Sequence, residues 1–372
     1  MSKIVIGFDQ NNNQYFKESI TFQHDRYFDW YNPNIIQTNY IYPLLLRAMM
    51  PNDFSFELSD NVLDDIKNQK CILCFDYTYE SRDLTNYNPE IHRYDTYSKV
   101  IENTKQRYNL QNIDHMYIDC NPHNTKLSNY NFYFNRWLFM QVTEFLKFKF
   151  LVKNKKTRPY KISSFNRRPD ESRFAFVDKV KNNEDVLCTL GKPEPQDISF
   201  YTEKWPELIN QLPLEYDEKL DLDLPNRVSI LKEELQQLSY IQVVNESFWH
   251  YSPNHMFLNE KTFKPIACLQ PFIINGIPGS LKHLHELGFK TFSNWWDESY
   301  DLETDVEKRI DKIAKLTLTL AEKSHTELAD MQYDMYDVLN HNVNVLRKFP
   351  LHKNLYDQLC NFSIDGIKYF SV

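Results

Sequence analysis

The stretch from Ser239 to Gly279 constrains the fold more than any other part of the chain. It begins with an apolar run, SYIQVV, and contains a second apolar run that stops at Gly276. Between the two runs, a polar loop leads to Glu-Lys-Thr at 260–262, a sequence typical of the first turn of a helix. A strand, a helix and a second strand in this order predict an α/β unit.

This unit places groups able to bind a nucleotide at one position. The first strand is expected to deliver Asn245, Glu246 and Ser247 to an edge of the sheet. Glu260 and Lys261 then lie beside the free N–H groups at the start of the helix. A carboxylate and an ammonium group at such a place can hold a ribose and a phosphate together. The alternative is a capped helix on which Glu260 and Lys261 are merely solvated.

The remainder of the chain shows the same alternation of strand and helix patterns. Strands are expected at residues 3–8, 70–77, 114–119 and 161–165, and helices at 40–50, 96–108, 134–150, 172–181 and 305–321. Residues 193–226 contain several prolines and many acidic residues, and they are expected to be an irregular insertion. The alternation predicts an α/β fold with parallel sheets.

The length of the chain, 372 residues, exceeds the usual size of one hydrophobic core, so two domains are expected. The polar segment 153–160, KNKKTRPY, is the best candidate for the linker. We place the first α/β domain at residues 1–155, the second at 156–345, and a C-terminal helical segment at 346–372.

Charge is unevenly distributed along the chain. A formal net charge of −8 argues against a protein that binds nucleic acid nonspecifically over its whole surface. Residues 147–173 nevertheless carry ten lysines and arginines against only two acidic residues, Asp170 and Glu171. This excess predicts a local anion site, and the alternative is a solvated linker.

The cysteines do not indicate a metal site. Only Cys71 and Cys74 of the six form a Cys-x-x-Cys pair, inside an apolar run expected to be a buried strand. No signal-peptide pattern and no apolar run near 20 residues occur, so a cytoplasmic location is expected. Six glycines among many Asn, Lys, Ile, Tyr and Phe residues are compatible with an AT-rich genome, such as that of a phage or a low-GC bacterium.

The segment 163–173, SSFNRRPDESR, has the layout of a phosphate-binding turn. A strand that ends near Asn166 is followed by Arg167, Arg168 and the start of a helix that contains Arg173. An arginine can grip a pyrophosphate with two parallel hydrogen bonds, which lysine does less well. The alternative is an exposed turn that precedes a helix with an acidic first turn.

Three short motifs carry a resemblance to a known family. The sequence VNES at 244–247 is followed by NEK at 259–261 and PFI at 271–273. This arrangement resembles the donor-binding segment of GT-B glycosyltransferases, especially the α1,3-fucosyltransferases and exostosin-like enzymes. In the α1,3-fucosyltransferases, ENS, TEK and PV stand at these places. Glu246 is displaced by one position relative to that pattern. The later run LKHLHELGFKTFSNWWDESYD resembles the C-terminal part of phage and bacterial glycosyltransferase-like proteins, and the resemblance covers roughly a hundred residues.

The resemblance implies a fold and a donor site. The fold would be two Rossmann-like domains with a C-terminal helix that crosses back to the first. Glu260 would contact ribose hydroxyls and Lys261 the phosphates, and Lys261 with an arginine would stabilise the leaving nucleoside diphosphate in place of a metal ion. No cofactor is expected besides the nucleotide-sugar donor itself. The predicted donor-binding residues are Asn166, Arg167, Arg168, Arg173, Glu246, Glu260, Lys261 and Thr262.

A general base is expected from the first domain, because inverting transfer needs one within reach of the acceptor hydroxyl. The predicted strand 70–77 ends at Asp76, and Glu80 lies four residues further on. These two carboxylates are the predicted catalytic residues, with His115 and Asp119 in reserve. Each of them is alternatively a surface acid or a capping residue.

The sequence therefore predicts a metal-independent glycosyltransferase, a hexosyl- or pentosyltransferase, that acts on a glycan or on a hydroxymethylated DNA base. One alternative is a noncatalytic nucleotide- or sugar-binding protein with the same fold. Another is a metal-dependent GT-A enzyme that uses Asp221 and Asp223, although this Asp-x-Asp pattern favours a solvated loop. The donor nucleotide, the sugar, the acceptor, the stereochemical outcome and the oligomeric state stay open.

Overall fold

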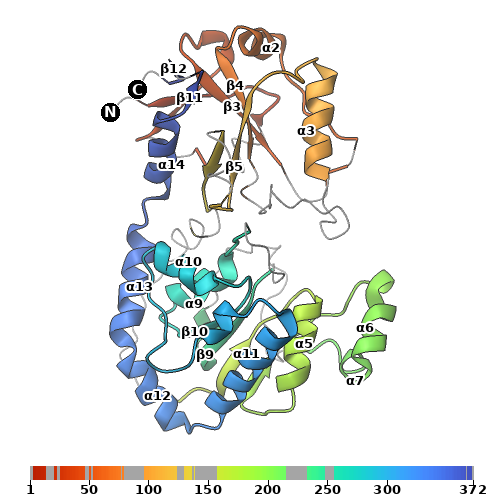
Figure 1. Ribbon diagram of the computed structural model, residues 1–372, viewed down its shortest axis with the longest axis vertical. Helices are drawn as coiled ribbons and strands as arrows, with labels where there is room; N and C mark the ends of the chain where they lie inside the picture. Colours follow the sequence, from red (N-terminus) through yellow and green to blue (C-terminus); the bar gives the residue numbers. More distant parts are fainter. Residues whose placement is uncertain are drawn as a thin grey trace. The chain divides into compact units, whose positions relative to one another are not determined.

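The computed structural model describes residues 3–13, 21–22, 26–46, 50–51, 53–76, 78, 96–123, 130–135, 138, 157–214, 233–247, 255–365 and 367–370. The chain divides into two compact units (Figure 1). Unit 1 comprises Met1–Arg136, Ser252–Met256 and Pro350–Val372, and unit 2 comprises Trp137–Tyr251 and Phe257–Phe349. Both contain parallel sheets with helices, so the predicted α/β class is confirmed.

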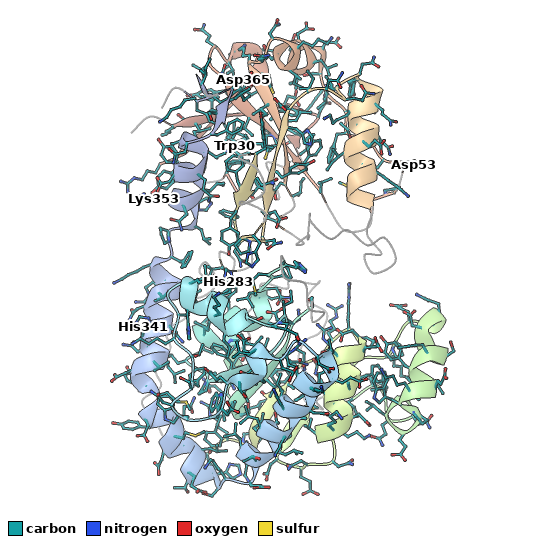
Figure 2. All side chains as sticks on the ribbon, viewed as in Figure 1. Trp30, Asp53, His283, His341, Lys353 and Asp365 are labelled. Atoms are coloured by element: carbon teal, nitrogen blue, oxygen red, sulfur yellow. The ribbon has the colours of Figure 1, made fainter. Side chains whose placement is uncertain are left out.

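Unit 1 is built on a six-stranded sheet in which every neighbouring pair is parallel. The strand order is β2-β1-β3-β4-β5-β6, with β1 (Ile4–Gly7), β2 (Phe28–Tyr31), β3 (Tyr40–Leu45), β4 (Cys71–Asp76), β5 (His115–Asp119) and β6 (Asn131–Tyr133). Between these strands the structure describes η1 (Pro33–Ile35), α2 (Asp60–Lys67) and α3 (Thr96–Arg107). At one edge, Trp30 of β2 donates its indole N–H to the carbonyl oxygen of Phe22 at 3.2 Å (Figure 2).

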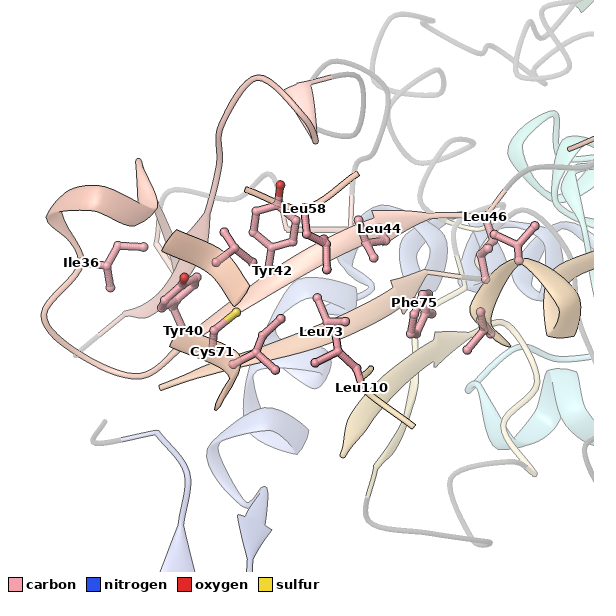
Figure 3. Packing of buried hydrophobic residues seen from close by; sticks show 14 residues of the cluster. Ile36, Tyr40, Tyr42, Leu44, Leu46, Leu58, Cys71, Leu73, Phe75 and Leu110 are labelled. Atoms are coloured by element: carbon pink, nitrogen blue, oxygen red, sulfur yellow. The ribbon is translucent and has the colours of Figure 1, made fainter. Parts of the chain in front are cut away.

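The prediction of a helix at residues 40–50 is wrong, because Tyr40–Leu45 form the strand β3 between β1 and β4. All six residues of β3 are buried. A strand buried on both faces loses the alternation of apolar and polar residues, so periodicity cannot separate it from a buried helix. Pro43 was the available signal, since proline disfavours a helix interior. Tyr40, Tyr42 and Leu44 instead join one hydrophobic cluster of unit 1 (Figure 3).

The C-terminal segment belongs to unit 1, as the predicted architecture requires. It consists of α14 (Leu351–Cys360) and the hairpin of β11 (Ser363–Ile364) and β12 (Ile367–Lys368). Gln358 exchanges two hydrogen bonds with the backbone of Tyr133, at 3.0 and 3.2 Å. Tyr356 packs on Tyr27 with ring centroids 5.2 Å apart. These contacts bind the end of the chain to the sheet of unit 1.

Unit 2 contains a four-stranded parallel sheet of order β10-β9-β7-β8. Its strands are β7 (Tyr160–Ser164), β8 (Val186–Cys188), β9 (Ser239–Asn245) and β10 (Phe272–Asn275). Its helices are α5 (Glu171–Val180), α6 (Ile198–Lys204), α7 (Pro206–Ile209), α8 (Glu233–Gln236), α9 (Glu260–Ala267), α10 (Ser280–Glu286), α11 (Val306–Ala321), α12 (His325–Asp334) and α13 (Tyr336–Lys348), with the 3-10 turns η3 (Pro195–Asp197) and η4 (Ser299–Leu302). The strand–helix–strand unit predicted at 239–279 is confirmed as β9, α9 and β10.

The irregular insertion expected at 193–226 is partly wrong, because α6 and α7 fall inside it. They form because Phe174 of α5 stacks on Tyr201, with ring centroids 4.3 Å apart, and packs 5.2 Å from Trp205. Local propensity does not reveal such an aromatic contact between distant segments. No helix among the described residues is both long and apolar enough to span a membrane.

Candidate functional site

The order of strands in unit 2 defines one edge at which ligands are expected. The chain runs from β7 to β8 on one side and then returns to β9 on the other side of β7. In open parallel sheets, ligands bind outside the carboxyl ends of the strands at such a reversal of order. Here this edge consists of the ends of β7 and β9 with segments 165–173, 245–247 and 259–262, and we call it the β7/β9 edge.

Three strand ends at the β7/β9 edge are linked by a buried chain of amide and hydroxyl groups. Asn245 donates to Ser164 Oγ at 2.9 Å and to Asn166 Oδ1 at 3.0 Å. Asn275, at the end of β10, donates to Asn245 Oδ1 at 2.7 Å and to Ser172 Oγ at 2.9 Å. All five residues are 0–2 % exposed. Sequence reasoning missed the roles of Asn275 and Ser172, although Asn275 ends its strand just as Asn245 does.

Arg173 is buried beneath this edge instead of projecting from it. Its guanidinium donates to the carbonyl oxygens of Asn245 at 3.3 Å and Glu246 at 3.4 Å, and to that of Arg168. Nε lies 3.1 Å from Asp170 Oδ2. The Arg173 side chain thus contacts the end of β9 and the turn before α5. Arg173 was predicted to contact the donor, but in the structure it positions these two segments.

The turn before α5 carries two exposed arginines, Arg167 and Arg168. Its backbone lies directly against Gly191, after β8: a Cβ atom on Gly191 would lie 2.1 Å from the carbonyl oxygen of Arg167. Only a residue without a side chain permits this approach. Asp170 caps α5 by accepting the N–H of Arg173 at 2.9 Å. The turn is therefore held from both sides.

Glu246 anchors the start of α9. Its Oε1 accepts the N–H of Asn259 at 3.1 Å and the hydroxyl of Thr262 at 2.6 Å. Glu246 is 1 % exposed, and burial raises its pKa while the charge of Lys261 and the Thr262 hydroxyl oppose that rise. Asn259 in turn accepts the N–H of Lys261 at 2.9 Å. Glu246 and Thr262 fix the helix start and are themselves enclosed.

Lys261 lies at this helix start with Glu260 beside it. Its Nζ donates to Ser247 Oγ at 3.0 Å and lies 3.7 Å from Glu260 Oε1. Burial raises the pKa of Asp170, and the charges of Arg173 and Lys261 act against that rise. Arg173 donates to the carbonyl oxygen of Glu246, next to the Ser247 that accepts from Lys261, so the arginine turn and the start of α9 meet at the end of β9. Glu260 is buried, whereas the Lys261 side chain is 27 % exposed.

Of the eight predicted donor-site residues, four therefore form the enclosed support: Asn166, Arg173, Glu246 and Thr262. Arg167, Arg168 and Lys261 are accessible cations carried by that support, with the carboxylate of Glu260 next to Lys261. Such an edge can bind a diphosphate through charge-assisted hydrogen bonds.

Asp76, the predicted base at the end of β4, is completely buried. One carboxylate oxygen accepts the Thr21 hydroxyl at 2.7 Å, and the other accepts the N–H and hydroxyl of Thr78 at 2.9 and 2.6 Å. Of the reserve residues, Asp119 ends β5 at the same carboxyl edge of the unit 1 sheet, whereas His115 begins β5 at the opposite edge. Glu80 lies outside the described residues, as do Asp221 and Asp223.

In the described part of the chain, no group of three or more His, Cys, Asp and Glu side chains is arranged to hold a metal ion.

Comparisons with known proteins find matches only among solved structures. A scan against models of protein families finds no match, and neither does a search of curated proteins. The chain is similar to a crystal structure of α1,3-fucosyltransferase, with 13% identity and a TM-score of 0.41 over 94% of this chain and 91% of that one. It is similar to an α-glucosyltransferase in complex with UDP and a 13-mer DNA containing a central A:G mismatch, with 9% identity, a TM-score of 0.35, and coverage of 93% and 99%.

T4 phage BGT in complex with UDP and Mn2+ is also similar, with 9% identity, a TM-score of 0.39, and coverage of 96% of this chain and 99% of that one. α1,3-Fucosyltransferase is thus both a family that the sequence resembles and a solved structure to which the chain is similar. At these identities and TM-scores, nothing about donor, acceptor or activity carries over from those proteins to this chain.

Proposed function

We propose that this chain is a glycosyltransferase that binds a nucleoside-diphosphate sugar at the β7/β9 edge and moves the sugar to an acceptor hydroxyl. The observation that supports it is that the segments carrying Arg167, Arg168 and Lys261 meet at the end of β9, at the reversal of strand order. The three cations come from two segments almost a hundred residues apart in sequence. Buried hydrogen bonds hold one segment to Asn245 at the end of β9 and the other to Glu246 directly after it.

The chemistry of transfer explains why cations are needed there. A bond forms between the acceptor oxygen and the anomeric carbon, and the bond from that carbon to the phosphate oxygen breaks. The electron pair of the broken bond leaves with the nucleoside diphosphate, whose negative charge grows. Fixed positive groups stabilise that charge in the transition state. In this proposal Lys261 and one arginine do so without a metal ion, and Glu260 accepts hydrogen bonds from the ribose hydroxyls.

The proton of the acceptor hydroxyl must pass to a base. Both oxygens of Asp76 already accept hydrogen bonds from Thr21 and Thr78. Of the two predicted carboxylates, we therefore propose Glu80 as the base and Asp76 as the residue that holds the end of β4. The acceptor is a glycan or a hydroxymethylated DNA base.

A thermal-shift panel of UDP, GDP, dTDP and CMP and their sugars, first in EDTA and then with Mn2+, tests the donor site. Stabilisation by one diphosphate in EDTA supports the proposal and names the nucleotide. Stabilisation only with Mn2+ removes the metal-independent clamp. No response to any of them contradicts a diphosphate site at this edge.

Donor consumption separates a transferase from a noncatalytic nucleotide-binding protein. The labelled donor sugar is incubated with a glycan panel and with hydroxymethylated duplex DNA. Transfer to either acceptor identifies it, and a salt-sensitive shift of the duplex supports DNA independently of turnover. Nucleotide binding without donor turnover, hydrolysis included, favours the binding protein.

A further inference from the structure

Unit 2 contains a pocket of about 360 Å³ that shares two lining residues, Glu171 and Ser172, with the segments of the β7/β9 edge. Three segments line it: α5, the end of α6 with Trp205, and the first turns of α11. Figure 1 shows α5 and α11 side by side, with α6 and α7 beyond α5. The volume lies in the range of about 300–1,000 Å³ that is typical of small-molecule sites.

The floor of the pocket is apolar. Ala175 of α5, Val306 and Ile310 of α11 and Trp205 line it. Trp205 is held in place by its contacts with Phe174 and Tyr201, at centroid distances of 5.2 and 6.0 Å. Lys204 lies over the Trp205 ring with Nζ 4.8 Å from its centroid. Trp205 is therefore fixed by neighbouring side chains without any ligand.

The rim is polar and carries both hydrogen-bond donors and acceptors. Lys204 Nζ lies 3.0 Å from Glu171 Oε1, and Lys179 Nζ lies 2.8 Å from Asp311 Oδ1. These pairs are substantially exposed, so each contributes little to stability and can exchange for contacts with a ligand. Among the described residues, Glu307 has no salt-bridge partner. Carboxylates outnumber ammonium groups around the pocket.

We propose that this pocket binds a neutral saccharide unit. The excess of carboxylates disfavours phosphates and nucleotides. Sugar hydroxyls both donate and accept, so they match a rim of carboxylates and ammonium groups. The C–H face of a sugar matches the apolar side chains of Ala175, Val306 and Ile310 that line the pocket. The pocket therefore fits a glycan, and not the charged backbone of DNA.

The pocket adjoins the β7/β9 edge through Glu171 and Ser172, and Ser172 also accepts the hydrogen bond from Asn275. A role as the acceptor subsite rests on the proposed function, whereas saccharide binding does not. The two can therefore fail separately.

The test uses the full chain without nucleotide. Saturation-transfer NMR and titration calorimetry are run with the methyl glycosides of glucose, galactose, mannose and fucose, with lactose and maltose, and with spermidine as a cationic probe. We expect millimolar binding of at least one saccharide. Ala175→Leu, which adds a bulkier side chain to the pocket lining, and Glu307→Gln, which removes one charge, should each weaken it at least five-fold. Glu322→Gln, beyond the far end of α11, is the matched control and should not.

The proposal is overturned if no saccharide binds, or if both pocket variants bind saccharide as tightly as the wild type does. It is also overturned if spermidine is the only probe that binds and Glu307→Gln weakens spermidine binding. Thermal melting of each variant checks that it folds, and the conservative Glu307→Gln stays informative if Ala175→Leu does not. If the wild-type chain binds a saccharide but no nucleotide in the thermal-shift panel, the result counts against the proposed donor site and not against the saccharide pocket.

Discussion

The side chains at the β7/β9 edge fall into two groups, one enclosed and one accessible at the surface. Arg173, Glu246 and Thr262 are enclosed and hold backbone segments, whereas Lys261 reaches the surface from the frame they make. Changes to the accessible group should alter ligand binding with little effect on folding. Changes to the enclosed group should alter both.

Lys261→Ala tests the accessible group. Charged hydrogen bonds contribute about 1.5–3 kcal/mol, so nucleoside-diphosphate affinity should fall by roughly ten- to a hundred-fold. Isothermal titration with the nucleotide identified by the thermal-shift panel measures it. Lys290→Ala, an exposed lysine elsewhere in unit 2, is the control. Unchanged affinity and turnover in Lys261→Ala would remove the lysine from the phosphate site.

Gly191→Ala tests the support of the arginine turn. The new Cβ would meet the carbonyl oxygen of Arg167 at 2.1 Å, so the turn or the loop after β8 must shift. Overpacking of this kind costs about 1–3 kcal/mol, and nucleotide affinity should fall with stability. Urea unfolding and titration measure both. Glu194→Ala, at an exposed position in the same loop, should change neither, and wild-type affinity in Gly191→Ala would show that the turn tolerates displacement.

At the level of secondary-structure elements, α9 is tied to β9 by a carboxylate and not by apolar packing alone. Glu246 accepts from both the backbone and the side chain of the first turn of α9. A second polar group at an element boundary is His115, which begins β5 and contacts Tyr117 and Lys105. The contacts of Glu246 and of His115 each lead to a prediction about the free energy of unfolding.

Thr262→Val removes the hydroxyl that donates to Glu246 at 2.6 Å and keeps the shape of the side chain. The buried carboxylate then lacks one partner, which should lower the free energy of unfolding by about 1–3 kcal/mol. Thr317→Val is the matched control, because that buried hydroxyl donates only to a helix carbonyl, that of Ile313. Equal losses in the two variants would mean that the Glu246 contact contributes nothing special.

The pKa of His115 is lowered from 6.5 to about 4 by burial and by the charge of Lys105. The unfolded chain therefore binds more protons than the folded one between these values, so stability is full above about pH 6.5 and falls as the pH drops toward 4. At most, this difference amounts to roughly 3–4 kcal/mol.

Urea unfolding at pH 7.5, 5.5 and 4.5 checks this for the wild type and for His115→Gln. The variant should lose less stability on acidification, and His341→Gln, which changes a histidine on α13 (Figure 2), should follow the wild type. Parallel acid profiles for His115→Gln and the wild type would contradict a neutral His115 in the folded state.

For the molecule as a whole, the notable feature is that unit 1 is completed by the end of the chain. β2 carries Phe28 and is preceded by Tyr27, and both rings contact Tyr356 of α14, at 6.4 and 5.2 Å. The last residues thus stabilise strands that begin more than three hundred positions earlier.

Tyr356→Ala should therefore destabilise unit 1 and leave unit 2 unchanged. Truncating a large buried aromatic residue costs about 3–5 kcal/mol. Hydrogen exchange should accelerate in β1 and β2 and stay constant in β7 and β9. Tyr333→Ala, whose side chain is 68% exposed in unit 2, should change neither. Equal acceleration in both units would contradict the separate dependence of unit 1 on α14.

Several parts of this architecture were predictable from local patterns. β9, α9 and β10 were, because a buried run, an Asn cap and a Glu-Lys-Thr first turn act within a few residues of one another. The turn with Arg167 and Arg168 was predictable in the same way. The roles of Asn275, Ser172 and Gly191 were not, since each depends on a partner 24 or more positions away.

Residue types and their spacing therefore established the α/β class and the chemistry available at one edge of the second sheet. Which of those side chains face outward was settled by packing: Arg173 and Glu246 are both charged, yet the fold encloses them because backbone groups of β9 and α9 become their partners. The same reason makes β3 a strand, since neighbours on both sides supply its hydrogen bonds. Burial and long-range hydrogen bonds exist only once the chain is folded, and no local pattern encodes them.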